Sequence, residues 1–73
     1  MVLKFKPEDI LFHKRVQTYI KILQCNYPFP GMYVFRDMKT GKVINRNKDL
    51  IEDNCILCTN PAAVEVLFGN KQR

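Results

Sequence analysis

A two-stranded β-hairpin is predicted by the stretch Met32-Tyr33-Val34-Phe35-Arg36-Asp37-Met38-Lys39-Thr40-Gly41-Lys42-Val43-Ile44. Apolar residues open and close this stretch, while Asp37 can accept hydrogen bonds from turn amides and Gly41 can take a positive φ. A turn of this kind between two apolar segments is typical of an antiparallel hairpin. We therefore expect a hairpin over residues 32–45, preceded by a stiff corner with two prolines at residues 26–31.

An amphipathic helix is predicted for residues 7–25. Pro7 suits the first position of a helix, and the acidic pair Glu8-Asp9 suits the positive end of the helix dipole. The apolar side chains that follow recur at helical spacing and form one stripe. This stripe consists of Phe12, Val16, Tyr19, Ile20 and Leu23, and the opposite face carries Lys14, Thr18 and Lys21. Residues 1–6 are too few to indicate more than a tail or a short strand.

Residues 46–73 are expected to form a loop, a short strand and a last element whose type stays open. The run Cys55–Cys58 is short, apolar and bounded by asparagines, which indicates a strand. Asn60-Pro61-Ala62-Ala63 can begin a helix, or it can be a tight turn before an alternating strand at 64–68. The sequence thus predicts a single α+β domain over residues 1–73. In this fold the N-terminal helix packs on an antiparallel sheet of three or four strands, with a short C-terminal helix as an option.

The composition indicates a small folded domain with surface left over for partners. The 73 residues are 47% hydrophobic and carry a formal net charge of +5. A chain near this size buries only about 60% of the surface that its unfolded form exposes. Some of its three tyrosines and five phenylalanines are therefore expected to face a protein neighbour. The basic pI of about 9.3 favours a polyanion such as RNA as a second partner.

A cluster of cations in and after the hairpin is the leading candidate for a binding site. Five cations fall within thirteen residues against Asp37 alone. In RNA-binding proteins such cations contact phosphates, and a tyrosine ring stacks on an unpaired base. The candidate RNA-binding residues are Arg36, Lys39, Lys42, Arg46 and Lys48 from this cluster, Lys14 and Lys21 from the predicted helix, and Tyr27 and Tyr33 for stacking. The alternative is that these cations only keep an exposed strand edge soluble.

The cysteines are the candidates for metal or redox chemistry. Cys55 and Cys58 are separated by two residues, as in zinc and thiol–disulfide sites, but a structural zinc site needs four ligands. The other available ligands are Cys25 and His13. Three interpretations stay open, namely buried core cysteines with no cofactor, partial zinc ligation, and redox activity.

No arrangement of residues indicates an enzyme. The chain has no serine, its three glycines form no phosphate-binding pattern, and the adjacent pairs Glu8-Asp9 and Glu52-Asp53 would diverge on a helix. We therefore expect a non-catalytic protein without a small-molecule substrate. The N-terminus lacks an export signal, and no apolar run reaches the roughly 20 residues of a membrane-spanning helix. The expected location is an intracellular, reducing compartment, either the cytoplasm or the mitochondrion, away from membranes.

Residues 30–38 and 41–44 carry a pattern of an aromatic, a β-branched residue, Phe-Arg, a turn with glycine, then a cation and two aliphatics. This pattern resembles the opening hairpin of a fungal mitochondrial large-ribosomal-subunit protein family, also described as recombination factors. The chain differs from that family in being far shorter and in beginning with the predicted helix. The resemblance implies membership of a ribosomal or other RNA–protein particle, with Arg36, Lys39 and Lys42 at the matched positions.

A second resemblance is to Sm-like RNA-binding proteins. It rests on the predicted N-terminal helix, a small twisted sheet and the run Leu67-Phe68-Gly69-Asn70. The chain departs from that family because it lacks a glycine in the second strand, and because Phe68 stands where those proteins carry a basic residue.

These observations predict a non-catalytic small basic subunit of a larger RNA–protein assembly, ribosomal or ribosome-like. It would contact RNA, ribosomal RNA by the first resemblance, through the basic hairpin, and neighbouring proteins through exposed aromatic side chains. The first alternative is a protein-only interaction module, such as an accessory or inhibitory subunit, with a viral origin among the options. The second alternative is a CxxC metal or thiol protein.

Overall fold

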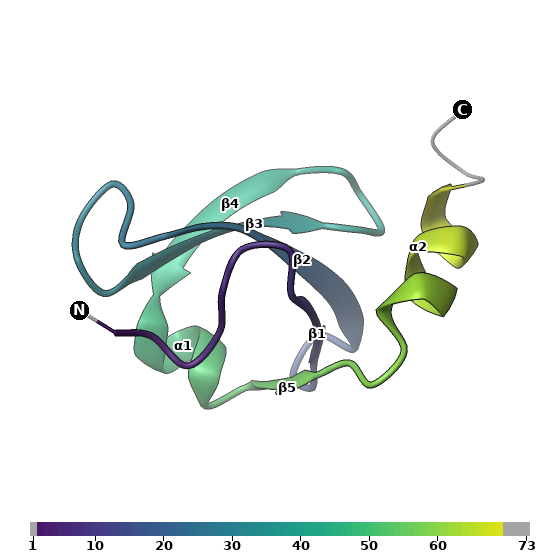
Figure 1. The fold of residues 1–73 in the computed structure, drawn as a ribbon, viewed down its shortest axis with the longest axis horizontal. Helices are drawn as coiled ribbons and strands as arrows, with labels where there is room; N and C mark the ends of the chain where they lie inside the picture. Colours follow the sequence, from purple (N-terminus) through teal and green to yellow (C-terminus); the bar gives the residue numbers. More distant parts are fainter. Residues whose placement is uncertain (1, 70–73) are drawn as a thin grey trace.

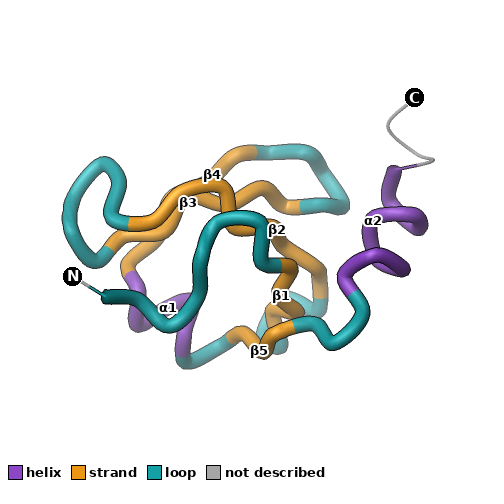
Figure 2. Tube along the Cα trace, viewed as in Figure 1, coloured by secondary structure: helices purple, strands orange, loops and turns teal. Residues whose placement is uncertain are grey.

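One antiparallel sheet organises the chain (Figures 1 and 2). The computed structural model describes residues 2–69, and within them it contains five β-strands and two short α-helices. In chain order these are β1 (Ile10–His13), β2 (Thr18–Cys25), β3 (Met32–Asp37), β4 (Val43–Asn47), α1 (Lys48–Glu52), β5 (Cys55–Leu57) and α2 (Pro61–Gly69).

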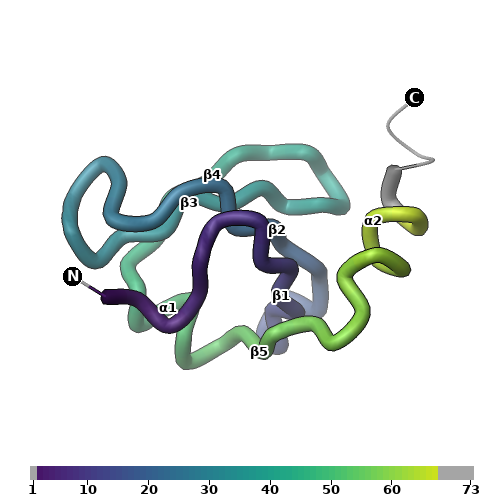
Figure 3. The backbone as a smooth tube through the Cα atoms, viewed as in Figure 1, coloured from purple at the N-terminus to yellow at the C-terminus, as the bar shows by residue number. Residues whose placement is uncertain are grey.

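The strand order is β4-β3-β2-β1-β5, and every neighbouring pair is antiparallel. Strands β1 to β4 follow one another as a meander. Helix α1 then carries the chain back, so that β5 pairs with β1 at the opposite edge although the two strands are far apart in the sequence (Figure 3). The sheet curves around a concave face, which α1 and the N-terminal segment 2–9 cover in part (Figure 1).

The N-terminal helix predicted for residues 7–25 is wrong, because this segment forms β1, a turn and β2. Side chains alternate along β2, where Thr18, Ile20 and Ile22 are buried and the residues between them less so. This period of two belongs to a strand, which β-branched residues also favour. The apolar side chains that form one stripe on a helix point instead to both faces of the sheet. Within residues 2–69 the sheet has five strands, not the three or four that the sequence predicts.

Two turns interrupt the segment 7–25 that the sequence predicts as a helix. Glu8 has a φ of 78° and Gln17 a φ of 53°, values that interrupt any right-handed helix. The carboxylate of Asp9 accepts a hydrogen bond from the backbone amide of Lys6 at 3.0 Å, which closes the first turn. Asp9 therefore stabilises a turn in front of β1, and Glu8 pairs with Lys21, so neither side chain caps a helix.

The hairpin predicted for residues 32–45 is confirmed as β3 and β4, which pair along their length. In its turn, Asp37 Oδ1 accepts from the backbone amides of Lys39 at 2.8 Å and Thr40 at 3.3 Å, and Gly41 has a φ of 78°. A strand is also present where the run Cys55–Cys58 predicts one, as β5. The sequence patterns that predict the hairpin and β5 lie within the segments that form them.

The main core fills one end of the concave face. It consists of Phe5, Leu11, Ile20, Ile22, Tyr33, Phe35, Ile51 and Cys55. Phe5 comes from the N-terminal segment and is only 5% exposed, and its ring centroid lies 6.2 Å from that of Tyr33. Fully burying one such side chain stabilises the fold by about 1.5–3 kcal/mol relative to leaving it exposed. The N-terminal segment is therefore part of the core and not a tail.

A smaller core lies on the opposite face of the sheet, beneath α2. It contains Ile10, Met38 and Val64, with Tyr19 and Cys58 packed against it. Of the two alternatives that the sequence leaves open for this segment, the helix is the one found. The amide of Ala63 donates to the Asn60 side chain at 3.3 Å, as at a helix N-cap. Asn70, the last residue of the Sm-like run, lies outside the described residues.

Candidate functional site

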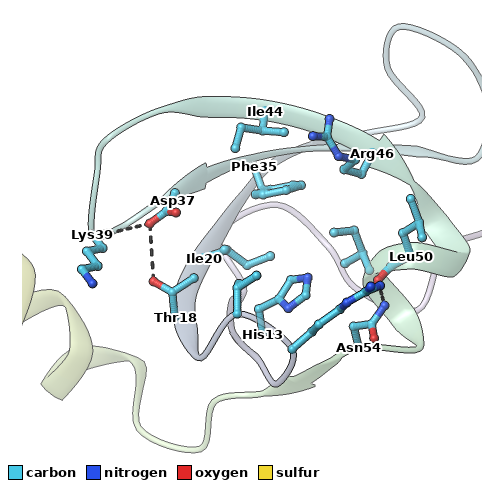
Figure 4. Close-up of a pocket in the computed structure, with 13 residues that line it drawn as sticks. His13, Thr18, Ile20, Phe35, Asp37, Lys39, Ile44, Arg46, Leu50 and Asn54 are labelled. Carbon is cyan, nitrogen blue, oxygen red and sulfur yellow. Dashed lines mark hydrogen bonds between the residues drawn. The ribbon is translucent and has the colours of Figure 1, made fainter.

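A cavity of about 410 Å³ opens at the end of the concave face that the main core does not fill (Figure 4). Three segments meet around it, namely the β1–β2 turn, the β3–β4 hairpin with its turn, and α1 with the residue Asn54 behind it. Because β1, β2 and β3 also carry the main core, the cavity and the core share one continuous apolar surface.

Apolar side chains form the floor of the cavity. Ile20, Phe35 and Ile51 are almost fully buried there, and Ile44 of β4 lies beside Phe35, its partner across the two strands. Val16 of the β1–β2 turn also lines the cavity and is 62% exposed. The floor thus offers apolar surface that is reached from solvent.

Polar groups line the walls. Thr18 Oγ1 donates to Asp37 Oδ1 at 3.4 Å, and the same carboxylate holds the turn amides of the hairpin, so Asp37 is engaged within the protein. Asn54 Nδ2 donates to the backbone carbonyl of Leu50 at 2.7 Å, which fixes the orientation of that amide. These hydrogen bonds hold polar side chains of the walls within the protein.

His13 lines the cavity. Its Nδ1 atom is buried within the protein, out of reach of solvent, and makes no hydrogen bond of good geometry to any described residue. Partial burial lowers the pKa of the His13 imidazole, interaction with its own backbone opposes this, and the positive charge of Arg15 lowers the pKa further. The ring is therefore held in its neutral form near neutral pH, with one nitrogen able to donate and the other to accept.

Three cations line the cavity from three different places in the fold. They are Arg15 of the β1–β2 turn, Lys39 of the hairpin turn and Arg46 of β4. Figure 4 shows Lys39 and Arg46 on different sides of the cavity, with His13 between and below them. Within residues 2–67 none of the three forms an ion pair, and Arg46 donates only to the carbonyl of Asn45. With the carboxylate of Asp37 counted against these three cations, the lining has a net positive charge.

Two of the other predicted RNA-binding cations are paired with acidic side chains. Lys21 is held by Glu8 at 3.2 Å and by Glu65 at 3.0 Å, and these hydrogen bonds raise the pKa of its ammonium group. Lys48 pairs with Asp49 at 3.0 Å. Neither lysine lines the cavity.

The remaining cations lie at the surface, outside the lining of the cavity. Arg36 sits between Phe35 and Asp37 on β3, and since alternate strand residues point to opposite faces, it faces away from the cavity. Lys14 and Lys42 are exposed in the two turns. Of the seven predicted cations, Lys39 and Arg46 are the two that the cavity brings together.

The two tyrosines proposed for stacking differ in their surroundings. Tyr33 is 0% exposed, and its hydroxyl donates to Glu52 Oε2 at 2.6 Å while it accepts from the Phe5 amide at 3.0 Å. Burial and the hydrogen bond to Glu52 raise the pKa of Tyr33. Its ring is therefore enclosed in the core and has no free face for a base. Tyr27 is 55% exposed beside Phe29 in the corner between β2 and β3 and can still stack.

The cysteines do not converge. Cys55 packs in the main core and Cys58 against the smaller core on the other face, while Cys25 Sγ donates to the Phe5 carbonyl at 3.4 Å. Burial raises the pKa of the Cys55 thiol to about 11 and also raises that of Cys25. Within residues 2–69 no three His, Cys, Asp or Glu side chains are grouped so that they could hold a metal ion. The thiols of Cys25 and Cys55 are therefore in their protonated form near neutral pH.

Sequence reasoning missed several residues of the cavity, above all Arg15. This arginine stands next to Lys14, but the assignment of the segment to a helix hid the turn that brings Arg15 to the hairpin. The sequence pattern places Val16 in an apolar stripe, whereas the structure leaves it exposed in the turn between β1 and β2.

No family model, no curated protein and no solved structure matches this chain. Among the described residues, no helix is both long and apolar enough to cross a bilayer.

Proposed function

We propose that this chain is a non-catalytic RNA-binding subunit of a larger RNA–protein assembly and that it holds single-stranded RNA over the cavity. The observation that carries the proposal is the set of three unpaired cations, Arg15, Lys39 and Arg46, around an apolar hollow. Phosphates along a strand need such cations, and the exposed bases need apolar or aromatic surface. The resemblance of the hairpin to a ribosomal protein family points to a ribosomal or ribosome-like assembly.

Two other features support RNA over a neutral partner. Arginine supplies two of the three cations, and its planar guanidinium group matches the oxygens of a phosphate in a bidentate manner. The acidic side chain of the cavity lining, Asp37, accepts hydrogen bonds from Thr18 and from turn amides and forms no ion pair with the three cations, so the lining has three cations against one carboxylate. A polyanion can thus approach the three cations without displacing an internal ion pair.

The salt dependence of RNA binding tests the proposal. A short fluorescein-labelled single-stranded RNA is titrated with the protein at several salt concentrations, and fluorescence anisotropy gives the affinity. Each phosphate contact contributes about 0.7 to the slope of log affinity against log salt for a single strand. We expect a slope of about −2 from three contacts, and a smaller slope in Arg15→Ala, Lys39→Ala and Arg46→Ala.

Arg36→Ala is the matched control, because it removes the same charge from the other face of the sheet. It is expected to leave the slope nearly unchanged. A wild-type slope near zero, or equal slopes in all four variants, would contradict RNA binding over the cavity.

A second candidate function is docking on another protein through the free edge of β5. Ile56 and Leu57 of this short edge strand are exposed, and with Phe12, Tyr19 and Cys58 they border a groove of about 310 Å³. An exposed strand edge with apolar side chains is suited to pair with an extended segment of a partner. In that case a complex isolated from cells would survive nuclease, would be lost in Ile56→Lys and would persist in Arg46→Ala.

A further inference from the structure

We infer that the cavity admits one unstacked base of the bound strand. The inference rests on the proposed function and adds a recognition mode to it. Cations on a flat protein surface would bind RNA by charge alone. Here the cations surround a hollow with an apolar floor and polar walls.

The size and lining of the cavity fit a base. Its volume of about 410 Å³ falls in the range of sites for small molecules, roughly 300–1,000 Å³. A nucleobase has apolar faces and polar edges, and proteins read unpaired bases by burying the faces and hydrogen-bonding the edges. In this cavity Ile20, Phe35 and Ile44 supply the apolar surface, and His13 and Thr18 supply polar atoms.

The position of the charges fixes which part of the ligand enters. Arg15, Lys39 and Arg46 come from the segments that border the cavity, and Ile20 and Ile51 lie buried at its base. The phosphates on either side of an extruded nucleotide would meet the cations while its base descends onto the apolar floor. Removing a base from its stack is least costly in a single strand, which is the form of RNA proposed here.

A comparison of two strands tests base entry. One is a short single-stranded RNA, and the other is a fully abasic ribose-phosphate strand of the same length, which keeps every phosphate. We expect the wild type to bind the RNA about tenfold more tightly than the abasic strand, within the range of one base-stacking contact. Ile44→Trp, which fills the cavity, should bind both strands alike and keep the salt slope of the wild type.

Val43→Trp is the matched control, since Val43 is the exposed neighbour of Ile44 and is not part of the cavity. It should keep the tenfold preference. If Ile44→Trp does not fold, NMR of the wild type decides the matter. The methyl signals of Ile20, Ile44 and Ile51 should then shift with RNA and not with the abasic strand.

The outcomes separate the two proposals. Equal, salt-dependent binding of both strands by the wild type, without shifts of the cavity methyl groups, would overturn base entry and leave RNA binding intact. Absence of binding to either strand would overturn both. A free nucleoside monophosphate that binds as tightly as the strand would also overturn the inference, because the cavity would then be a small-molecule site.

Discussion

The two ends of the concave face are built from the same strands but are completed differently. At the closed end the N-terminal segment lays Phe5 into the core, and Glu52 accepts hydrogen bonds from the Tyr33 hydroxyl and from the Lys4 amide. At the open end no described segment covers the floor of the cavity, and the cations around it form no ion pair within residues 2–67.

This difference separates stability from binding. At the closed end the polar atoms of Tyr33 are satisfied inside the protein, so a ligand would have to break existing hydrogen bonds. At the open end a ligand would supply partners that the protein does not provide. A domain of this size has little stability to spare. The packing at the closed end supplies stability, and this allows the cavity at the open end to remain unfilled.

The largest expected effect comes from emptying the closed end. Phe5→Ala should lower the free energy of unfolding by about 3–5 kcal/mol, because it removes an aromatic ring from the core and leaves a cavity. Phe29→Ala is the matched control, since Phe29 is 67% exposed and should change stability by less than about 0.5 kcal/mol. Urea unfolding followed by circular dichroism measures both.

Phe5→Leu keeps this test decisive if Phe5→Ala does not fold at all. The smaller truncation should give a measurable loss of stability in a folded protein. Equal effects of changes at Phe5 and Phe29 would show that the N-terminal segment does not close the core.

The next effect concerns the hydroxyl of Tyr33. Tyr33→Phe should cost about 1–3 kcal/mol, because the Phe5 amide loses its acceptor and Glu52 loses a donor. Tyr27→Phe removes the same hydroxyl from an exposed ring and should be nearly neutral. Thermal unfolding of the two variants beside the wild type gives the comparison.

The same hydrogen bond predicts a dependence on acid. The Tyr33 hydroxyl, and then the Lys4 amide, lower the pKa of Glu52 below its ordinary value of 4.5. Since the folded-state pKa is depressed, this stabilisation is present above pH 4.5 and is lost as the pH falls through the folded-state value. Stability measured as the pH is lowered from 4.5 should fall in the wild type and less steeply in Tyr33→Phe. Identical slopes would mean that Glu52 is not held by Tyr33.

The hairpin could be predicted from the sequence because its determinants are local. Asp37 and Gly41 shape the turn, and both act on residues within a few positions of themselves. The strands β1 and β2 could not be recognised in this way. Their apolar residues fit a helix in projection, and what decides between helix and strand is the pairing of β1 with β5, far along the chain.

The candidate site was predictable to the extent that it belongs to the hairpin. Lys39 and Arg46 are part of the basic cluster that the sequence shows, and the cavity includes both. Arg15 and His13 reach the cavity only because of the β1–β2 turn. The sequence predicts a helix at this place, so it could not indicate that these two residues meet the hairpin. The enclosure of Tyr33 likewise depends on Phe5 and Glu52, and nothing in the local sequence indicates that these side chains meet it.

Filling the open end should have a smaller effect of opposite sign. Ile44→Phe places a second ring opposite Phe35 on the neighbouring strand, within the space that the cavity leaves. We expect a gain of about 0.5–1.5 kcal/mol from the aromatic pair together with weaker binding of RNA. Val43→Phe adds the same ring on the exposed neighbouring position and should produce neither change. A loss of stability in Ile44→Phe would show that the open end is already tightly packed.

The smallest expected effect is the absence of coupling between the two ends. Lys39→Ala removes an exposed cation and should alter the free energy of unfolding by no more than about 0.5 kcal/mol, although it weakens RNA binding. In the double variant with Phe5→Leu, the two losses of stability should add within about 0.5 kcal/mol, because the two side chains share no partner in the structure. The fold-loss of RNA affinity caused by Lys39→Ala should also be the same in both backgrounds, at a temperature where every variant is folded. A clear departure from additivity in either quantity would mean that closing one end sets the shape of the other, and the cavity would then be a consequence of the core and not an independent site.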